Sequence, residues 1–226
     1  AGTKELVLLS VKDNRGMVPL HQALRGRCTL NTIFALIVDD VVAVSRTSQG
    51  QTCLHLAVRY GAEAKVIERI LAADPTAVLE RDAVLGSLPL HLLLRASSAS
   101  KDVVEMLVKA AISLDPASRG GLWYKDNRGR TPLRVAVQHG VASDVVRSLI
   151  ALADEHRGGG TPCGGGGDDG GNGGGDEPRQ RRGLLPAEIV DNQGQIPLHT
   201  ACVFAAEACI VEMLLVERFA QGISLK

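Results

Sequence analysis

A six-residue motif recurs five times along this chain of 226 residues, and each copy is followed by apolar residues at helical spacing. The motif reads Gly, two further residues, Pro or Cys, Leu, and then His or Arg. Its leucines are Leu20, Leu54, Leu90, Leu133 and Leu198, so successive copies are separated by 34, 36, 43 and 65 residues. A period in the thirties with growing insertions indicates short units stacked in a row, because no single unit can bury its own apolar face.

Each copy begins with residues that favour a tight turn and then a helix. Residues 13–16 read Asp-Asn-Arg-Gly, in which the polar side chains bond to their own backbone and Gly supplies a positive φ. A proline such as Pro132 suits the first helical turn, where its missing amide proton is not needed. Thr52 and Thr131 are predicted N-caps. The first helix is expected to be short and to end near a glycine, as at Gly61.

A second helix is predicted in every copy from apolar pairs that recur four residues apart. This spacing places the four side chains on one stripe of a helix. The pairs are Ile33-Phe34 with Ile37-Val38, Val66-Ile67 with Ile70-Leu71, Val103-Val104 with Leu107-Val108, Val145-Val146 with Leu149-Ile150, and Ile210-Val211 with Leu214-Leu215.

Together, the turn, the Pro-Leu-His helix start of residues 19–21 and 197–199, and the second helix resemble the ankyrin repeat. The resemblance implies an all-α fold, namely an ankyrin-type helix-turn-helix solenoid with β-turn or hairpin loops. Four ankyrin-like repeats are expected in residues 1–157 and a fifth in 184–226, on either side of a disordered Gly-rich insertion at 158–183. The chain departs from the family pattern at Cys53, which replaces Pro, and at Arg134, which replaces His.

The repeated histidines His21, His55, His91 and His199 occupy one equivalent position in each unit that has them. Neighbouring helix layers stack about 8–10 Å apart, so these side chains cannot share one metal ion, whose ligand nitrogens lie about 2 Å away. The resemblance to ankyrin repeats implies instead that each histidine bonds the backbone of its own and the adjacent turn. Arg134 is expected to keep part of that bonding.

The Gly-rich stretch contains Gly165, Gly167 and Gly170 at the spacing of a dinucleotide-binding loop. Such a loop must leave a strand and open a helix, whereas here glycine continues on both sides. This density of glycine predicts a flexible insertion. Its arginines admit two interpretations, a solvated charge cluster or a basic partner site or nuclear-import signal. They are Arg179, Arg181 and Arg182.

Composition limits the remaining classes of function. Equal numbers of acidic and basic residues give a formal net charge of zero, so nucleic-acid binding is not expected. The apolar runs fall short of the roughly 18 residues of a membrane span, and no leader peptide is visible. Five cysteines without CxxC spacing are interpreted as free thiols of an intracellular protein, cytoplasmic or nuclear. The chain is expected to be a monomer without metal or cofactor.

Length varies at one place in the repeat, the connection from the second helix into the next turn. In a stack these connections line up along one edge, where repeat proteins commonly bind partners. Trp and Tyr favour interfaces, and the only Trp lies in such a connection. The alternative for this Trp is that it packs under its own hairpin. The candidate partner-binding residues are Trp123 and Tyr124 with the turn-tip residues Arg15, Arg81, Arg128 and Gln193.

The predicted function is a noncatalytic protein-protein interaction scaffold or adaptor that binds an unidentified protein through its repeat surfaces and loops. The alternative is the regulatory or targeting ankyrin region of a larger enzyme or membrane protein. No Ser-His-Asp or Cys-His arrangement stands apart from the repeat pattern, so no catalytic residue is assigned. Residues 224–226 resemble residues 10–12, which directly precede a turn, and this predicts a fragment of a longer array.

Overall fold

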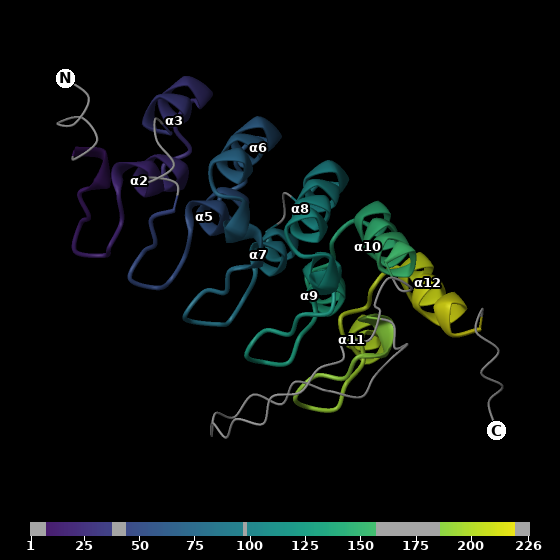
Figure 1. Cartoon of the computed structure of the whole chain (residues 1–226). Coiled ribbons are helices and arrows are strands. Elements are labelled where there is room, and N and C mark those ends of the chain that lie inside the picture. Colours follow the sequence, from purple (N-terminus) through teal and green to yellow (C-terminus); the bar gives the residue numbers. More distant parts are fainter. Residues whose placement is uncertain (1–7, 38–43, 97–98, 157–185, 220–226) are drawn as a thin grey trace, which may run out of the picture.

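The computed structural model describes residues 8–37, 44–96, 99–156 and 186–219, with side chains up to residue 215 in the last helix. Five pairs of helices follow one another in these residues (Figure 1). The first helices of the pairs are α2 (Pro19–Arg25), α5 (Cys53–Arg59), α7 (Pro89–Arg95), α9 (Pro132–Gln138) and α11 (Pro197–Val203). The second helices are α3 (Leu30–Leu36), α6 (Ala64–Ala73), α8 (Lys101–Leu114), α10 (Ser143–Glu155) and α12 (Ala208–Phe219).

The pairs stack side by side, so the first helices form one layer and the second helices another (Figure 1). Short 3-10 helices stand in three of the connections between pairs, at η1 (Pro75–Leu79), η2 (Pro116–Gly121) and η3 (Pro186–Glu188). The turns project on one side of the first-helix layer. The predicted all-α fold is confirmed.

The predicted insertion at 158–183 lies outside the described residues, and so do Cys163, the three arginines near its end and residues 224–226. The domain boundaries drawn around the insertion therefore stay predictions.

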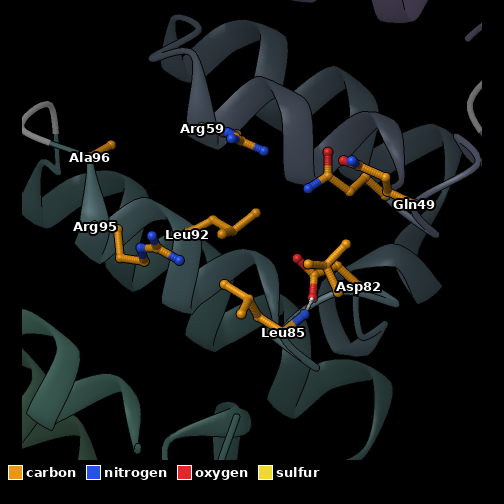
Figure 2. A pocket seen from close by; sticks show the side chains of 9 residues that line it. Gln49, Arg59, Asp82, Leu85, Leu92, Arg95 and Ala96 are labelled. Carbon is orange, nitrogen blue, oxygen red and sulfur yellow. Dashed lines mark hydrogen bonds between the residues drawn. The ribbon is translucent and has the colours of Figure 1, made fainter. Parts of the chain in front are cut away.

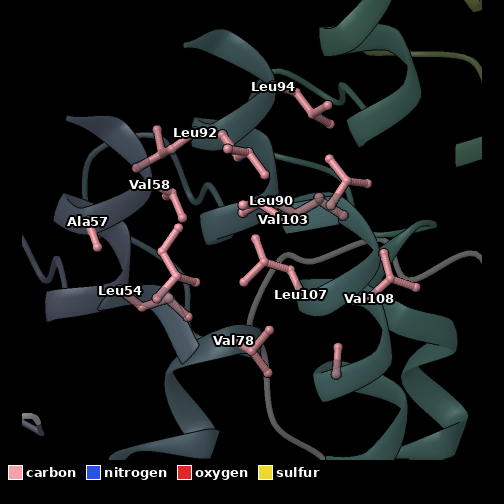
Figure 3. Close-up of a cluster of buried hydrophobic side chains, with 14 of the residues drawn as sticks. Leu54, Ala57, Val58, Val78, Leu90, Leu92, Leu94, Val103, Leu107 and Val108 are labelled. Carbon is pink, nitrogen blue, oxygen red and sulfur yellow. The ribbon is translucent and has the colours of Figure 1, made fainter. Parts of the chain in front are cut away.

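The core is aliphatic and continuous from the first pair to the fifth. Around α5, α7 and α8 it contains leucine and valine side chains from both layers, among them Leu54, Leu90 and Leu107 (Figure 3). Such a core gains its stability from apolar area removed from water, and that area is shared between neighbouring units.

The predicted apolar stripe holds for α6, whose Val66, Ile67, Ile70 and Leu71 are all buried. Val38, which the prediction placed on the stripe of the first unit, lies outside the described residues. The predicted stripe is wrong in part for this first unit, because Phe34 is 39% exposed. The reason is that α6 packs between α3 and α8, whereas α3 contacts a second helix on one side within the described residues.

The helix ends follow the predicted capping chemistry. Thr52 and Thr131 accept hydrogen bonds through their hydroxyl oxygens from the amides of the third helical residues of α5 and α9. Gly61 and Gly140 have positive φ directly after these two helices end. Both predictions are confirmed.

Each turn is closed by one side-chain oxygen that accepts two backbone amides. In the fourth turn, Oδ1 of Asp126 accepts from the amides of Arg128 and Arg130, both at 2.9 Å. Asp13, Asp82 and Asp191 do the same in their turns, and the hydroxyl of Thr47 does so in the second. The turns are therefore held in shape before they meet one another.

Successive turns are joined by hydrogen bonds at their tips. The amide of Ser48 donates to the Arg15 carbonyl at 3.0 Å, and the amide of Ala83 donates to the Gln49 carbonyl at 2.9 Å. Asn127 donates through its amide to the Leu85 carbonyl at 2.8 Å. Between the fourth and fifth turns a side chain does this, since Asn192 Nδ2 donates to the Asn127 carbonyl at 3.1 Å.

His55 and His91 join the base of their own turn to the next unit, as the family resemblance implied. Nδ1 of His91 accepts the Leu88 amide at 3.2 Å, and its Nε2 lies 3.1 Å from the Arg130 carbonyl. His55 makes the same pair of bonds to the Thr52 amide and to the Ser87 carbonyl, at 3.2 and 3.1 Å. A neutral ring that accepts at Nδ1 and donates at Nε2 satisfies both contacts.

Arg134 makes the corresponding link in the fourth unit. Its Nη1 donates to the Gln195 carbonyl at 2.9 Å, and Gln195 directly follows the turn glycine of the fifth unit. Its Nη1 also lies 2.7 Å from Oδ2 of Asp191, in an ion pair whose side chains are 9% and 4% exposed. The expectation that Arg134 keeps part of the bonding of the histidine is confirmed.

Two turn glycines provide a matched test of the contact between turns. Gly129 and Gly194 have φ of 76° and 75°, but a Cβ on Gly129 would lie 2.6 Å from the Asn192 backbone nitrogen, whereas one on Gly194 meets nothing within 4 Å. We expect Gly194→Ala to lower the free energy of unfolding by about 1 kcal/mol, the cost of the left-handed backbone. Gly129→Ala should lower it by about 2–4 kcal/mol, because backbone must also move. Urea unfolding followed by circular dichroism measures both, and equal losses would contradict the contact.

The buried histidines predict a stability that depends on pH. Burial lowers the pKa of His21 and of His91 to about 4, and it also lowers the pKa of His55. The unfolded chain therefore binds more protons between about pH 6.5 and 4, so stability is full above this range and is lost as the pH falls through it. His21 and His91 each contribute a slope of about 1.4 kcal/mol per pH unit within this range.

Urea unfolding at several pH values from about 7.5 to 5 measures this slope, and His91→Gln should reduce it by the share of one histidine. A free energy of unfolding that stays constant over this range in the unchanged chain would contradict the assignment of neutral, buried rings.

Candidate interaction surface

The exposed tips of the turns form a row along one edge of the stack (Figure 1). The tip position is the second residue after the Asp or Thr that closes the turn. As predicted, Arg15, Arg128 and Gln193 occupy this position and are exposed. The sequence analysis missed two further tip residues, Gln49 and Val84.

The third turn is one residue longer than the others, because Asp82 and Gly86 are four positions apart where Asp126 and Gly129 are three apart. Its tip residue is Val84, whose side chain is 55% exposed. The assignment of Arg81 to the turn tip is wrong, since Arg81 precedes the closing acid. Counting forward from Asp82 as the closing acid would have found Val84.

Arg81 and Tyr124 lie together at the base of the third and fourth turns. The guanidinium of Arg81 lies over the Tyr124 ring, 5.3 Å from its centre. Its Nη1 also donates to the Lys125 carbonyl at 3.2 Å. A cation over an aromatic face is attracted by the ring electrons, so these residues already contact each other without a partner.

Trp123 is half buried and packs against the apolar core. The guanidinium of Arg119 lies 5.2 Å from the centre of its ring. Arg119 reaches this position from a left-handed backbone with φ of 48°. These contacts favour the packing alternative for Trp123, and its role in partner binding stays a prediction.

A cleft of about 340 Å³ opens between the second and third units (Figure 2). Its walls come from two turns and from the ends of two first helices. The lining residues are Gln49, Gln51, Arg59, Asp82, Val84, Leu85, Leu92, Arg95 and Ala96.

The cleft combines apolar, amide and cationic groups. Leu92, with the turn residues Val84 and Leu85, supplies apolar surface, and two arginines reach it from the ends of α5 and α7 (Figure 2). Asp82 is 4% exposed, and its Oδ1 is occupied by the amides of Leu85 and Ser87 at 2.9 and 3.0 Å. The lining is thus about half polar, so it can meet both the apolar and the hydrogen-bonding groups of a partner.

Chemistry of other kinds finds little support in the described residues. They hold no group of three or more His, Cys, Asp or Glu side chains placed to bind a metal ion. Burial raises the pKa of the Cys53 thiol to about 12, so this residue is a poor nucleophile. Cys28 and Cys202 are exposed, Cys209 is half buried, and all three are free. None of the described helices is both long and apolar enough to cross a bilayer.

Comparison with known proteins adds one family. The family model described as Ankyrin repeat matches residues 49–79, which cover the second turn, α5, α6 and η1. A search of curated proteins finds no match to the chain. The matched unit shares its turn, its helix pair and its buried histidine contact with neighbouring units of the stack. On this match the second unit is an ankyrin repeat, and the other units repeat its motif and its helix pair.

Proposed function

We propose that this chain is a noncatalytic scaffold or adaptor that holds a partner protein between its turn tips and its first helices. Ankyrin repeats are generic protein-protein interaction modules. The observation that carries the proposal is the cleft between the second and third units, with Val84 exposed at its edge. The free cysteines among the described residues support an intracellular location.

The surface is suited to binding because its parts are already fixed. The turns are closed by Asp or Thr side chains and are bonded to one another at their tips. A partner that docks there orders few loops, and a rigid surface loses less conformational entropy on association. Burial of an exposed valine adds about 1–2 kcal/mol of favourable transfer free energy.

Val84 stands out among the tip residues, because the other four are Arg or Gln. An exposed apolar side chain at the edge of a cleft, with amide and cationic groups beside it, has the arrangement of an interface anchor. Gln49 lines the same cleft from the second turn. The two side chains therefore offer a partner an apolar contact and a hydrogen-bonding amide.

Replacement of both residues tests this surface. The change Val84→Ser with Gln49→Ala should lower recovery of a partner in affinity capture from the source cell by about tenfold, as expected for loss of a central anchor. The control is Leu114→Ser, which changes an apolar residue of similar exposure, 42%, at the end of a second helix. It should leave recovery unchanged.

Circular dichroism should show the same helical content in both variants, because none of the three changed side chains is buried. Equal recovery with the double variant and the unchanged chain would exclude this cleft as the binding site. Loss of recovery with Leu114→Ser alone would move the site to the second-helix layer.

A further inference from the structure

Three arginines occupy one equivalent position in consecutive units. Arg25, Arg59 and Arg95 are the last residues of α2, α5 and α7, and all three are exposed. These helices contact one another in order along the stack. The position changes to Gln138 and Val203 in the fourth and fifth units, so the positive stripe is confined to the first three.

Among the described residues, none of the three arginines forms an ion pair. Other arginines of the chain do so at short range, as in the contact of Arg46 with Glu80 at 2.6 Å and that of Arg130 with Asp126 at 2.6 Å. Each stripe arginine also meets the negative end of its helix dipole, an interaction worth about 0.3–1 kcal/mol at a surface. The guanidinium of Arg59 also lies 5.9 Å from the centre of the Tyr60 ring. The N–H donors lie in the plane of each guanidinium, so they remain for a carboxylate from outside.

Two of the arginines border the cleft described above. Figure 2 shows Arg59 and Arg95 on the helix side of the cleft and Asp82 on the turn side, with Leu92 between Arg95 and Asp82. The acid is occupied by its own turn amides, so the cationic side of the cleft is separated from it by apolar surface. A ligand that suits this surface has acidic groups next to apolar ones.

The spacing of the stripe fits an extended peptide. Stacked helices lie about 8–10 Å apart. A polyproline II peptide has three residues per turn and rises about 3.1 Å per residue, so every third side chain lies on one face, about 9 Å from the last. Carboxylates at positions one, four and seven of such a peptide would meet successive arginines.

We propose that Arg25, Arg59 and Arg95 receive an acidic, extended segment of a partner protein, with carboxylates at every third residue and apolar residues between them against Leu92 and Val84. This proposal rests on the proposed function and names the chemistry of its partner. Nucleic acid fits less well, because the net charge is zero and arginines lie over the rings of Trp123 and Tyr124.

The test uses a fluorescent peptide of sequence Glu-Pro-Leu-Glu-Pro-Leu-Glu and the whole chain, with binding followed by anisotropy. We expect saturable binding at low salt that weakens as salt is added, because exposed ion pairs are screened. Replacement of the three Glu with Gln in the peptide should weaken binding about tenfold, and Arg59→Gln with Arg95→Gln in the chain should do the same. The control variant, Arg69→Gln with Arg147→Gln, removes two exposed arginines from second helices and should change affinity less than about twofold.

Several outcomes of the binding experiment overturn the proposal. One is that the Gln peptide binds as tightly as the Glu peptide. Another is that the Arg59/Arg95 variant and the Arg69/Arg147 variant lose the same affinity. A third is that a single-stranded oligonucleotide of matched charge binds more tightly than the Glu peptide. Partner capture that depends on Val84 and Gln49 but not on Arg59 and Arg95 would also overturn it, and in that case the proposed function would stand. If neither partner capture nor peptide binding changes in any of the cleft variants, both this proposal and the proposed function are wrong.

Discussion

The stack depends on a hydrogen bond that the first helices α5, α7 and α9 each make to the turn of the next unit. The free energy that nucleation of a helix costs is larger than the free energy gained from the hydrogen bonds of two turns. A first helix of seven residues is therefore too short to be stable in isolation. Its third residue, His55 in the second unit and His91 in the third, bonds both its own helix start and the following unit. Formation of the helix and addition of a neighbour are thus one event, and the array gains stability from pairs of units.

The same contacts set the functional surface. The carbonyl that His91 reaches belongs to Arg130, whose amide is bound by the acid that closes the fourth turn. A change in stacking is therefore transmitted directly to the position of a tip. The buried ion pair of Arg130 with Asp126 fixes this turn further, with side chains that are 7% and 1% exposed. Removal of one partner from such a pair leaves an uncompensated charge, so the turn has one stable arrangement.

Much of this organisation can be read from the sequence, because glycine and proline restrict the backbone locally. The turn glycines and the helix starts follow from residue type and period, and the role of Arg134 follows from the resemblance to ankyrin repeats. The tip at Val84 was missed because one inserted residue shifts the third turn, and Arg81 was placed there in its stead. The contact of Arg119 with the Trp123 ring could not be predicted, because Arg119 has a positive φ. No local sequence pattern indicates that a residue other than glycine takes this conformation. The cleft requires side chains from two units, so it is a property of the stack.

Arg134 has a consequence for how this chain can change in length. It joins α9 directly to the fifth turn, and Lys125 Nζ adds a bond to the Val190 carbonyl at 2.8 Å. These contacts join the fourth unit to the residues that follow the longest connection of the chain, and none of the side chains that make them belongs to the Gly-rich stretch. Doubling the length of a closed loop costs only about 0.6 kcal/mol. We therefore expect this connection to tolerate the insertion of a reporter or a second domain, while the units on both sides keep their contacts.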